Sequence, residues 1–268
     1  MGLGGVDLDS ESWVGSEEPE PTVSVVIPAK NEAHNLPRVL AELPCDVYEV
    51  ILVDGCSTDD TVKVAQWLRP DIISIGQTRT GKGNALACGF AVATGDFIVM
   101  LDADGSANPS EIQRFVDALK KGADFAKGSR FIKGGGSRDI SGFRRVGNYW
   151  LSKLANVLYG TRYTDLCYGY NAFRRECLPV LGLDGSVIAG TDGNSMLWGD
   201  GFEVETLINV RIAKAGLRVT EVPSFERRRG YGTSNLNAIS DGLRVLRTIH
   251  AERNGSDLMR LFALNWGA

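Results

Sequence analysis

The run Val23-Ser-Val-Val-Ile-Pro-Ala29 is almost wholly apolar, and the polar residues Lys30, Asn31 and Glu32 follow it directly. A strand without a clearly polar face is typical of a sheet that helices cover on both sides. Further short apolar runs predict strands at 50–54, 71–75, 97–102 and 124–129. Stretches with helical periodicity lie between them, at 35–43, 61–68, 83–93 and 110–121. Strands that alternate with helices in this way predict an α/β fold around a mainly parallel sheet.

The pattern is less regular after residue 129. Helices are predicted at 143–159 and 202–215, a last strand at 217–223 and a terminal helix at 236–253. The first 21 residues are acidic, carry no Lys or Arg and lack an apolar segment. We therefore predict a disordered N-terminal extension over 1–21 rather than a secretion signal.

Composition excludes several classes of protein. The 268 residues carry 29 Lys and Arg against 33 Asp and Glu, which argues against a nucleic-acid-binding protein. The five cysteines are widely spaced and form no Cys-x-x-Cys pair, so we predict neither a zinc site nor a disulfide framework and favour a cytoplasmic protein. The longest apolar stretch, 86–101, is interrupted by Gly89, Gly95 and Asp96, so it does not predict a membrane span.

Two carboxylates, Asp102 and Asp104, stand at the carboxyl end of the strand that begins at Phe97. Open α/β sheets bind their ligands at this edge. Paired carboxylates suit Mg2+ or Mn2+, which prefer oxygen ligands and often bridge to phosphates. An ordinary turn is the alternative, because Asp and the Gly105 that follows are good turn formers. The position at a strand end favours the metal site.

Asp54 ends another predicted strand, so its carboxylate would face the same edge of the sheet as Asn31 and Glu32. Donors and acceptors gathered at successive strand ends suit a base and a ribose, and this arrangement predicts a nucleotide pocket. Capping of the helix that begins at Thr61 is the alternative role for Asp54.

The segment Gly76-Gln-Thr-Arg-Thr-Gly81-Lys82-Gly83 imitates a P-loop. Gly83 stands where a P-loop has the Ser or Thr that binds Mg2+, which argues against a P-loop phosphohydrolase. Lys82 and the backbone amides at the start of a helix still favour binding of an anion.

Charged residues that suit phosphates gather in the second half of the chain. Arg130 follows a predicted strand, and the run Arg227–Arg229 precedes a Gly-rich loop. Arginine side chains bind phosphate oxygens in a bidentate manner. Three acidic residues surround the start of the helix predicted at 202–215, where negative charge also stabilises the helix dipole: Asp200, Glu203 and Glu205.

Several motifs, taken in order, resemble family 2 glycosyltransferases. They are Val25-Val-Ile-Pro-Ala-Lys-Asn31-Glu32, Val53-Asp-Gly-Cys-Ser-Thr-Asp59, Gly81-Lys-Gly-Asn-Ala, Gly95-Asp through Leu101-Asp-Ala-Asp104, and Gly128-Ser-Arg130. The series continues with Asp165-Leu-Cys-Tyr-Gly-Tyr-Asn-Ala-Phe173-Arg-Arg, Gly201-Phe-Glu203 and Arg228-Arg-Gly-Tyr-Gly-Thr-Ser234. This longer series is similar to the dolichol- or polyprenyl-phosphate mannose synthase branch.

The resemblance implies a GT-A fold, which is a Rossmann-like, mainly parallel sheet flanked by helices. The domain would cover 22–254, with a nucleotide-sugar half at about 22–131, an acceptor half at about 132–254 and a C-terminal tail at 255–268. It also implies a UDP- or GDP-linked sugar as donor and an active-site Mg2+ or Mn2+.

Carried onto this chain, the resemblance assigns site residues. The metal would be held by Asp102 and Asp104. The nucleotide sugar would contact Pro28, Ala29, Asn31, Glu32, Asp54, Lys82, Asp102, Ala103 and Asp104. The phosphates of the acceptor or donor would contact Arg130, Arg144, Arg145, Arg228 and Ser234. The catalytic residues would be Asp102, Asp104, Arg130 and Glu203.

The predicted reaction moves a sugar, with inversion, to a phosphorylated acceptor such as polyprenyl phosphate. A cation on Asp104, with Lys and Arg residues, would neutralise the leaving diphosphate. A phosphate acceptor is already anionic and needs no strong base. A hydroxyl acceptor would need a carboxylate such as Asp200, Glu203 or Asp192 to take its proton.

Three departures from the mannose synthases leave the acceptor open. Gly55-Cys56 replaces Asp-Gly, 168–171 replaces a Thr-Ser-Gly-Phe type segment, and Asn235 replaces Lys. The alternatives are a soluble phosphorylated or hydroxyl acceptor in polysaccharide or natural-product synthesis, and a non-catalytic nucleotide-sugar-binding protein. A polyprenyl phosphate would require peripheral contact with the inner face of the membrane, for which 236–253 and 258–264 are candidates; packing of that helix on its own domain is the alternative.

Overall fold

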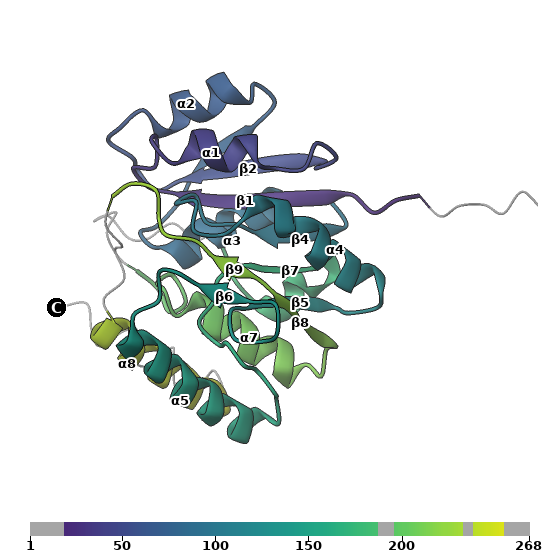
Figure 1. The fold of residues 1–268 in the computed structure, drawn as a ribbon, viewed down its shortest axis with the longest axis vertical. Coiled ribbons are helices and arrows are strands. Elements are labelled where there is room, and N and C mark those ends of the chain that lie inside the picture. The colour runs from purple at the N-terminus through teal and green to yellow at the C-terminus, as the bar shows by residue number, and fades with distance from the viewer. Residues whose placement is uncertain (1–18, 187–195, 233–237, 255–268) are drawn as a thin grey trace, which may run out of the picture.

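The computed structural model of the chain describes residues 19–186, 196–232 and 238–254 (Figure 1). Most of the predicted N-terminal extension and the whole C-terminal tail lie outside the described residues, as do Asp192, Ser234 and Asn235. The first half contains β1 (Val23–Ala29), α1 (Leu36–Ala41), β2 (Glu49–Asp54), α2 (Thr61–Leu68), β3 (Ile73–Gly76), α3 (Lys82–Val92), β4 (Phe97–Met100), η1 (Pro109–Glu111), α4 (Ile112–Lys120) and β5 (Phe125–Ser129). The second half contains β6 (Gly136–Ser137), α5 (Gly142–Tyr159), β7 (Asn171–Arg174), η2 (Arg175–Cys177), α6 (Leu178–Leu181), α7 (Val204–Lys214), β8 (Val219–Pro223), β9 (Phe225–Glu226) and α8 (Ala238–Asn254).

The central sheet has seven strands in the order β3-β2-β1-β4-β7-β5-β8, so the predicted mainly parallel α/β fold is confirmed. Within this described sheet, β7 alone runs antiparallel to its neighbours, β4 and β5. Sequence patterns did not predict β7, because only Ala172 and Phe173 of its four residues are apolar, which is too short an apolar run to indicate a strand. Tertiary packing holds it in place instead, with Ala172 and Phe173 fully buried.

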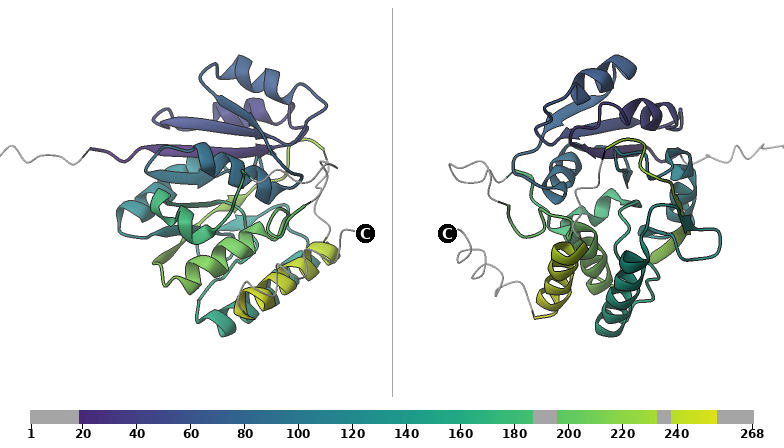
Figure 2. Two further views of the ribbon diagram at one scale, coloured as in Figure 1. Left: turned by 180° about the vertical axis from the view of Figure 1, so that it is seen from behind. Right: turned by 60° about the vertical axis from the view of Figure 1, so that its left-hand side comes forward.

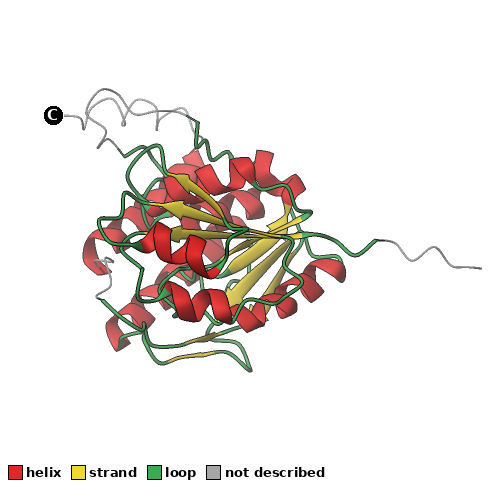
Figure 3. Cartoon of the chain, turned by 90° about the horizontal axis from the view of Figure 1, so that it is seen from above, coloured by secondary structure: helices red, strands yellow, loops and turns green. Residues whose placement is uncertain are grey.

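Helices cover both faces of the sheet, as Figure 3 shows from above. The side chains of β1 alternate between the two cores, which explains why this strand is apolar throughout. Val25 and Ile27 pack with α1, α2 and α4 on one face, whereas Val26 packs with α3, α6 and α7 on the other. The predicted helices at 61–68 and 143–159 are observed with almost the same bounds.

The helices α5 and α8 form a further layer that packs on α7 (Figure 2). Ala155, Val245 and Ile249 form their shared apolar contact. Ser141 begins α5 by accepting a hydrogen bond from the Arg144 N–H at 3.3 Å. This layer places two amphipathic helices beside the carboxyl edge of the sheet. No helix of the described ranges is long and apolar enough to cross a bilayer.

Candidate active site

A cavity of about 1190 Å3 opens at the edge of the sheet where β1 and β4 end. Polar residues that follow these strands form one part of its wall, and apolar side chains of α5 and α8 form another. The structure brings the following predicted site residues together in this wall: Pro28, Ala29, Asn31, Glu32, Lys82, Asp102, Ala103, Asp104, Arg130 and Arg144. The edge that the sequence predicted is therefore where the cavity lies.

Four predicted residues point elsewhere, and Ser234 lies outside the described residues. The Asp54 carboxylate accepts a hydrogen bond from the Ser57 N–H at 3.1 Å, in a local turn. The guanidinium of Arg145 stacks on Phe131, and the exposed Arg228 donates to a backbone oxygen. Glu203 is buried outside the cavity wall.

Arg229, next to the predicted Arg228, is the arginine of this run that reaches the cavity. Its guanidinium bridges two predicted site carboxylates. Nη2 is paired with Glu32, and Nη1 lies 3.4 Å from Oδ2 of Asp104. Burial raises the pKa of Glu32, and this effect outweighs the opposing contacts with Asn35 and Arg229. The bridge spans the ends of β1 and β4, so one cation is shared by the carboxylates that follow both strands.

Backbone contacts hold the segment that carries Arg229 across the site. The Arg227 N–H donates to the backbone carbonyl oxygen of Ser106 at 2.7 Å. The Tyr231 N–H donates to the side-chain Oδ1 of Asn35 at 2.9 Å. The Tyr231 ring also packs against His34, with 5.5 Å between centroids and 37° between the ring planes. Residues 227–231 therefore form a strap between the loops that follow β1 and β4.

Lys82 lies deeper in the cavity and bridges a second pair of carboxylates. Its Nζ lies 2.7 Å from Oδ1 of Asp102 and 2.7 Å from Oε1 of Glu205. Burial alone would lower the pKa of the Lys82 ammonium, but the two carboxylates outweigh burial and raise it. Burial also raises the pKa of Glu205, against the attraction of Lys82. Lys82 is therefore a fully charged ammonium in the cavity wall.

The glycines on either side of Lys82 are required by close backbone packing. The Gly83 N–H donates to the Asp200 oxygen at 2.7 Å, and a Cβ at Gly83 would lie 1.7 Å from the Gly199 oxygen. Asp200 is itself buried and paired with Arg79 at 2.8 Å. The turn Gly81-Lys82-Gly83 therefore packs closely against residues 199–200. The backbone amide of Gly83, which the sequence suggested for anion binding, already donates to Asp200.

Glu203 closes the loop before α7. Its Oε1 accepts hydrogen bonds from the Gly199 and Gly201 N–H groups at 3.2 and 3.3 Å. Its Oε2 has no hydrogen-bond partner among the described residues. Glu203 therefore stabilises the loop before α7, and its side chain makes no capping hydrogen bond to the helix that follows.

Arg130 is buried in a network of charges. Nε and Nη2 donate to Asp165 at 2.7 and 2.9 Å, and Nη1 donates to Glu226 at 3.0 Å. Its guanidinium also lies over the Tyr168 ring, 4.6 Å from the centroid. Asn148 donates to the same Asp165 carboxylate at 3.0 Å. The network ties β5, β9 and α5 to the segment before β7, so Arg130 joins the elements that frame the cavity.

The predicted metal residues offer two hard oxygen donors at the cavity wall. No cluster of three His, Cys, Asp or Glu side chains suited to a metal occurs in the described part of the chain. Two carboxylates are sufficient for Mg2+ or Mn2+, because these ions take further ligands from water and substrate phosphates. Asp102 and Asp104 each pair with one cationic side chain, so each has affinity for positive charge at this point. The donor set fits a divalent ion.

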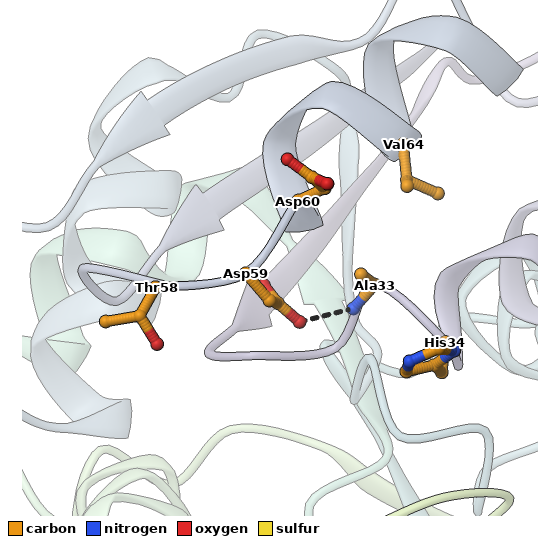
Figure 4. Close-up of a pocket in the computed structure, with 6 residues that line it drawn as sticks. All are labelled: Ala33, His34, Thr58, Asp59, Asp60 and Val64. Atoms are coloured by element: carbon orange, nitrogen blue, oxygen red, sulfur yellow. Dashed lines mark hydrogen bonds between the residues drawn. The ribbon is translucent and has the colours of Figure 1, made fainter.

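A second pocket, of about 350 Å3, lies beside the loop between β1 and α1 (Figure 4). Asp59 accepts a hydrogen bond from the Ala33 N–H there at 3.2 Å, and Asp60 and Val64 complete one side. Among the described residues, this pocket has no lining residue in common with the large cavity. Its carboxylates serve the turn before α2 and add nothing to the site.

Sequence reasoning missed the cavity-lining roles of Arg229 and Glu205. The run Arg227–Arg229 marked the correct segment, but adjacent positions of an extended strap face opposite sides. Glu205 carried a signal too, because it stands in the first turn of α7, where an acidic residue also stabilises the helix dipole. The sequence alone does not distinguish a role in the helix dipole from a role in the cavity wall. The contact between Glu205 and Lys82 shows the second role.

Comparisons with known proteins agree with this geometry. The sequence model of Glycosyl transferase family 2 matches residues 24–182. Polyprenol monophosphomannose synthase of Mycolicibacterium smegmatis is 33% identical over 80% of this chain and 80% of that protein. Undecaprenyl-phosphate mannosyltransferase of Micrococcus luteus is 31% identical over 80% of this chain and 87% of that protein.

The fold has counterparts among solved structures. Glucosyl-3-phosphoglycerate synthase from Mycobacterium tuberculosis, solved with Mn2+, UDP and glucosyl-3-phosphoglycerate, superposes with a TM-score of 0.64 at 23% identity. The match covers 87% of this chain and 80% of that chain, and it shows the predicted GT-A fold. The chain is therefore a glycosyltransferase, and it belongs to glycosyl transferase family 2.

Proposed function

We propose that this glycosyltransferase is metal-dependent and inverting, and that it moves a sugar from a UDP- or GDP-linked donor to a polyprenyl phosphate. The observation that carries the proposal is the shape of one cavity. Its wall combines the acidic pair Asp102 and Asp104 with apolar side chains of α5 and α8. A charged donor and an acceptor with a long apolar chain can therefore meet in one space.

The polar part of the cavity suits a nucleoside diphosphate. A divalent ion held by Asp102 and Asp104 would supply Lewis-acid neutralisation of the leaving diphosphate. Lys82 adds a protein cation in the same wall, and Arg229 adds another beside Asp104. Fixed positive groups of this kind stabilise charge as it develops on a leaving group. Pro28, Ala29 and Glu32 lie beside them, where the nucleoside would bind.

The surroundings of the proposed bases support a phosphate acceptor. Asp200 is paired with Arg79 and Glu203 is hydrogen-bonded within its own loop, and neither lines the cavity. An acceptor phosphate is already anionic and needs neither of them. Arg144 lines the cavity, and its long pair with Asp139, at 3.8 Å, leaves it suited to a phosphate.

The α5 and α8 helices supply the apolar end. Large side chains on these helices are exposed although they border the cavity: Phe143, Trp150, Leu154, Ile239, Leu243 and Leu246. An exposed apolar patch of this kind marks an interaction surface. We propose that it contacts the inner face of the membrane, where a polyprenyl chain would enter the cavity.

The relatives support this acceptor and this cofactor. The names of two relatives refer to polyprenol monophosphomannose and to undecaprenyl phosphate. The structural neighbour glucosyl-3-phosphoglycerate synthase was solved with Mn2+ or Mg2+ and UDP. Such neighbours also justify testing a small phosphorylated acceptor, which is the second candidate.

Incubation with radiolabelled UDP- or GDP-sugars, Mn2+ and undecaprenyl phosphate tests the proposal. We expect label to move into the organic phase, and we expect EDTA to prevent this transfer because the diphosphate would lose its counter-ion. Label that moves only to a water-soluble phosphate would replace the lipid acceptor with the second candidate. No transfer from any donor to either acceptor would refute the proposed activity.

Trp150→Glu is expected to weaken binding to vesicles that contain undecaprenyl phosphate by about tenfold, because an exposed indole that enters the lipid interface is replaced by a charge. Sedimentation with the vesicles measures the effect. Trp67→Glu is the matched control, because Trp67 is 80% exposed, against 66% for Trp150, but lies on α2 (Figure 1). Equal binding by both variants would contradict a membrane role for α5.

A further inference from the structure

We infer that Glu205 is a positioning residue. From the buried side of Lys82, it holds the ammonium toward the diphosphate of the donor. The inference rests on the proposed function, because it assigns a diphosphate to this part of the cavity. It names a carboxylate that lies outside the acidic pair Asp102 and Asp104.

The inference rests on how deeply the side chains of Glu205, Lys82 and Asp102 are buried. Glu205 and Asp102 contact the same Nζ of Lys82, each at 2.7 Å. The side chains are 6% exposed for Glu205, 14% for Lys82 and 35% for Asp102. The ammonium therefore lies between a deeply buried carboxylate and one that is open to the cavity. A ligand that enters from the cavity meets Asp102 and Lys82 before Glu205.

The buried ammonium of Lys82 needs a second carboxylate to balance its charge when Asp102 binds another cation. If Asp102 bound a divalent ion, Lys82 would keep Glu205 as its one remaining carboxylate partner. A buried ammonium without a carboxylate is costly and would turn away from the site. Glu205 keeps the ammonium charged and in place. An ammonium has three N–H donors, so one remains for Glu205 while the others reach phosphate oxygens.

The carboxylates of Glu203 and Glu205 extend in different directions at the start of α7. Residues two apart on a helix do not share a face. Glu203 accepts hydrogen bonds from the loop before the helix, whereas Glu205 extends into the cavity wall. Glu203 is therefore a natural control, since both are buried carboxylates at the start of α7.

The backbone at Gly169 closes the remaining side of this group of charges. A Cβ at this position would lie 2.9 Å from Oε1 of Glu205 and 3.0 Å from Nζ of Lys82. Both atoms are the ends of flexible side chains, so Gly169→Ala would displace them rather than prevent folding. The glycine thus provides space for the contact between Lys82 and Glu205.

Calorimetric binding of UDP and GDP, each compared with its monophosphate, tests the inference. We expect the unaltered protein to prefer the diphosphate. Glu205→Gln should weaken diphosphate binding about tenfold and leave monophosphate binding nearly unchanged, because a charge-assisted contact is lost. The loss should be largest with Mn2+ and smaller in EDTA, because without a metal ion Asp102 remains a carboxylate partner of Lys82. Glu203→Gln should keep the preference.

A double-variant comparison distinguishes positioning from a separate contribution. If Glu205 acts through Lys82, Lys82→Gln combined with Glu205→Gln should bind diphosphate no more weakly than Lys82→Gln alone. Gly169→Ala, a second route to the same disruption, should also lose preference for the diphosphate. Thermal unfolding confirms that each variant is folded.

The outcomes separate this inference from the proposed function. If the unaltered protein binds neither UDP nor GDP, the proposed function fails. If it prefers the diphosphates and Glu205→Gln or Gly169→Ala keeps that preference in full, the positioning role is overturned. Additive losses in the double variant would overturn it as well.

Discussion

Asp104→Asn is expected to lower the rate of sugar transfer at least about a hundredfold. Oδ1 of Asp104 accepts a hydrogen bond from the Ser106 N–H at 2.9 Å, and the Asn side chain can keep this bond. Oδ2 lies in the cavity wall near Arg229, where the loss of charge removes affinity for a divalent ion. The variant should therefore fold normally and fail in catalysis.

Initial rates with saturating donor over a series of Mn2+ concentrations measure this effect. Asp60→Asn is the control, because Asp60 is an exposed carboxylate at another strand-to-helix turn and pairs with Lys63. The control should retain full activity. Full activity of Asp104→Asn with saturating donor would show that the acidic pair does not hold the catalytic metal.

Arg130→Met is expected to destabilise the fold by about 3–5 kcal/mol, which is typical when one partner of a buried ion pair is removed. The substitution leaves the carboxylates of Asp165 and Glu226 buried without their cation. Urea unfolding at neutral pH measures the loss. Arg38→Met is the control, since its pair with Glu42 is exposed and is worth less than about 1 kcal/mol.

The same variant tests the role in acceptor binding that the sequence predicted for Arg130. In this structure Nε, Nη1 and Nη2 all donate to carboxylates. A residue that mainly joins β5 to its surroundings should lose stability on substitution, as argued above. If Arg130→Met were as stable as the unaltered protein but inactive, direct contact with a substrate would be the better explanation.

The first half of the fold could be predicted because each of its elements leaves a local pattern. β1 is apolar on both faces, and the strand ends carry polar residues in the order that a parallel sheet requires. The strand β7 could not be predicted from the sequence, because it depends on pairing with strands that are distant in the chain. This short strand is specified by its neighbours β4 and β5, and its own four residues carry no clear period.

The site could be predicted by segment but only partly by residue. The acidic pair and Lys82 line the cavity, and their positions could be expected because they directly follow or begin regular elements. Arg228 and Arg229 have the same chemistry, and only the path of the strap decides which one reaches Glu32. Glu203 and Glu205 differ in the same way, through the direction of α7.

The reversed direction of β7 has a consequence for how the cavity wall is built. Because β7 runs against its neighbours, its beginning lies at the edge where β4 ends. Residues 167–170 therefore reach the cavity from a different part of the chain than the residues that follow β1 and β4. Changes in this one peptide would reshape the cavity wall, including the space beside Lys82 and Glu205, while β1, β2 and β4 keep their register. A single inverted strand thus lets one short peptide alter the cavity wall without any change in the pairing of the parallel strands.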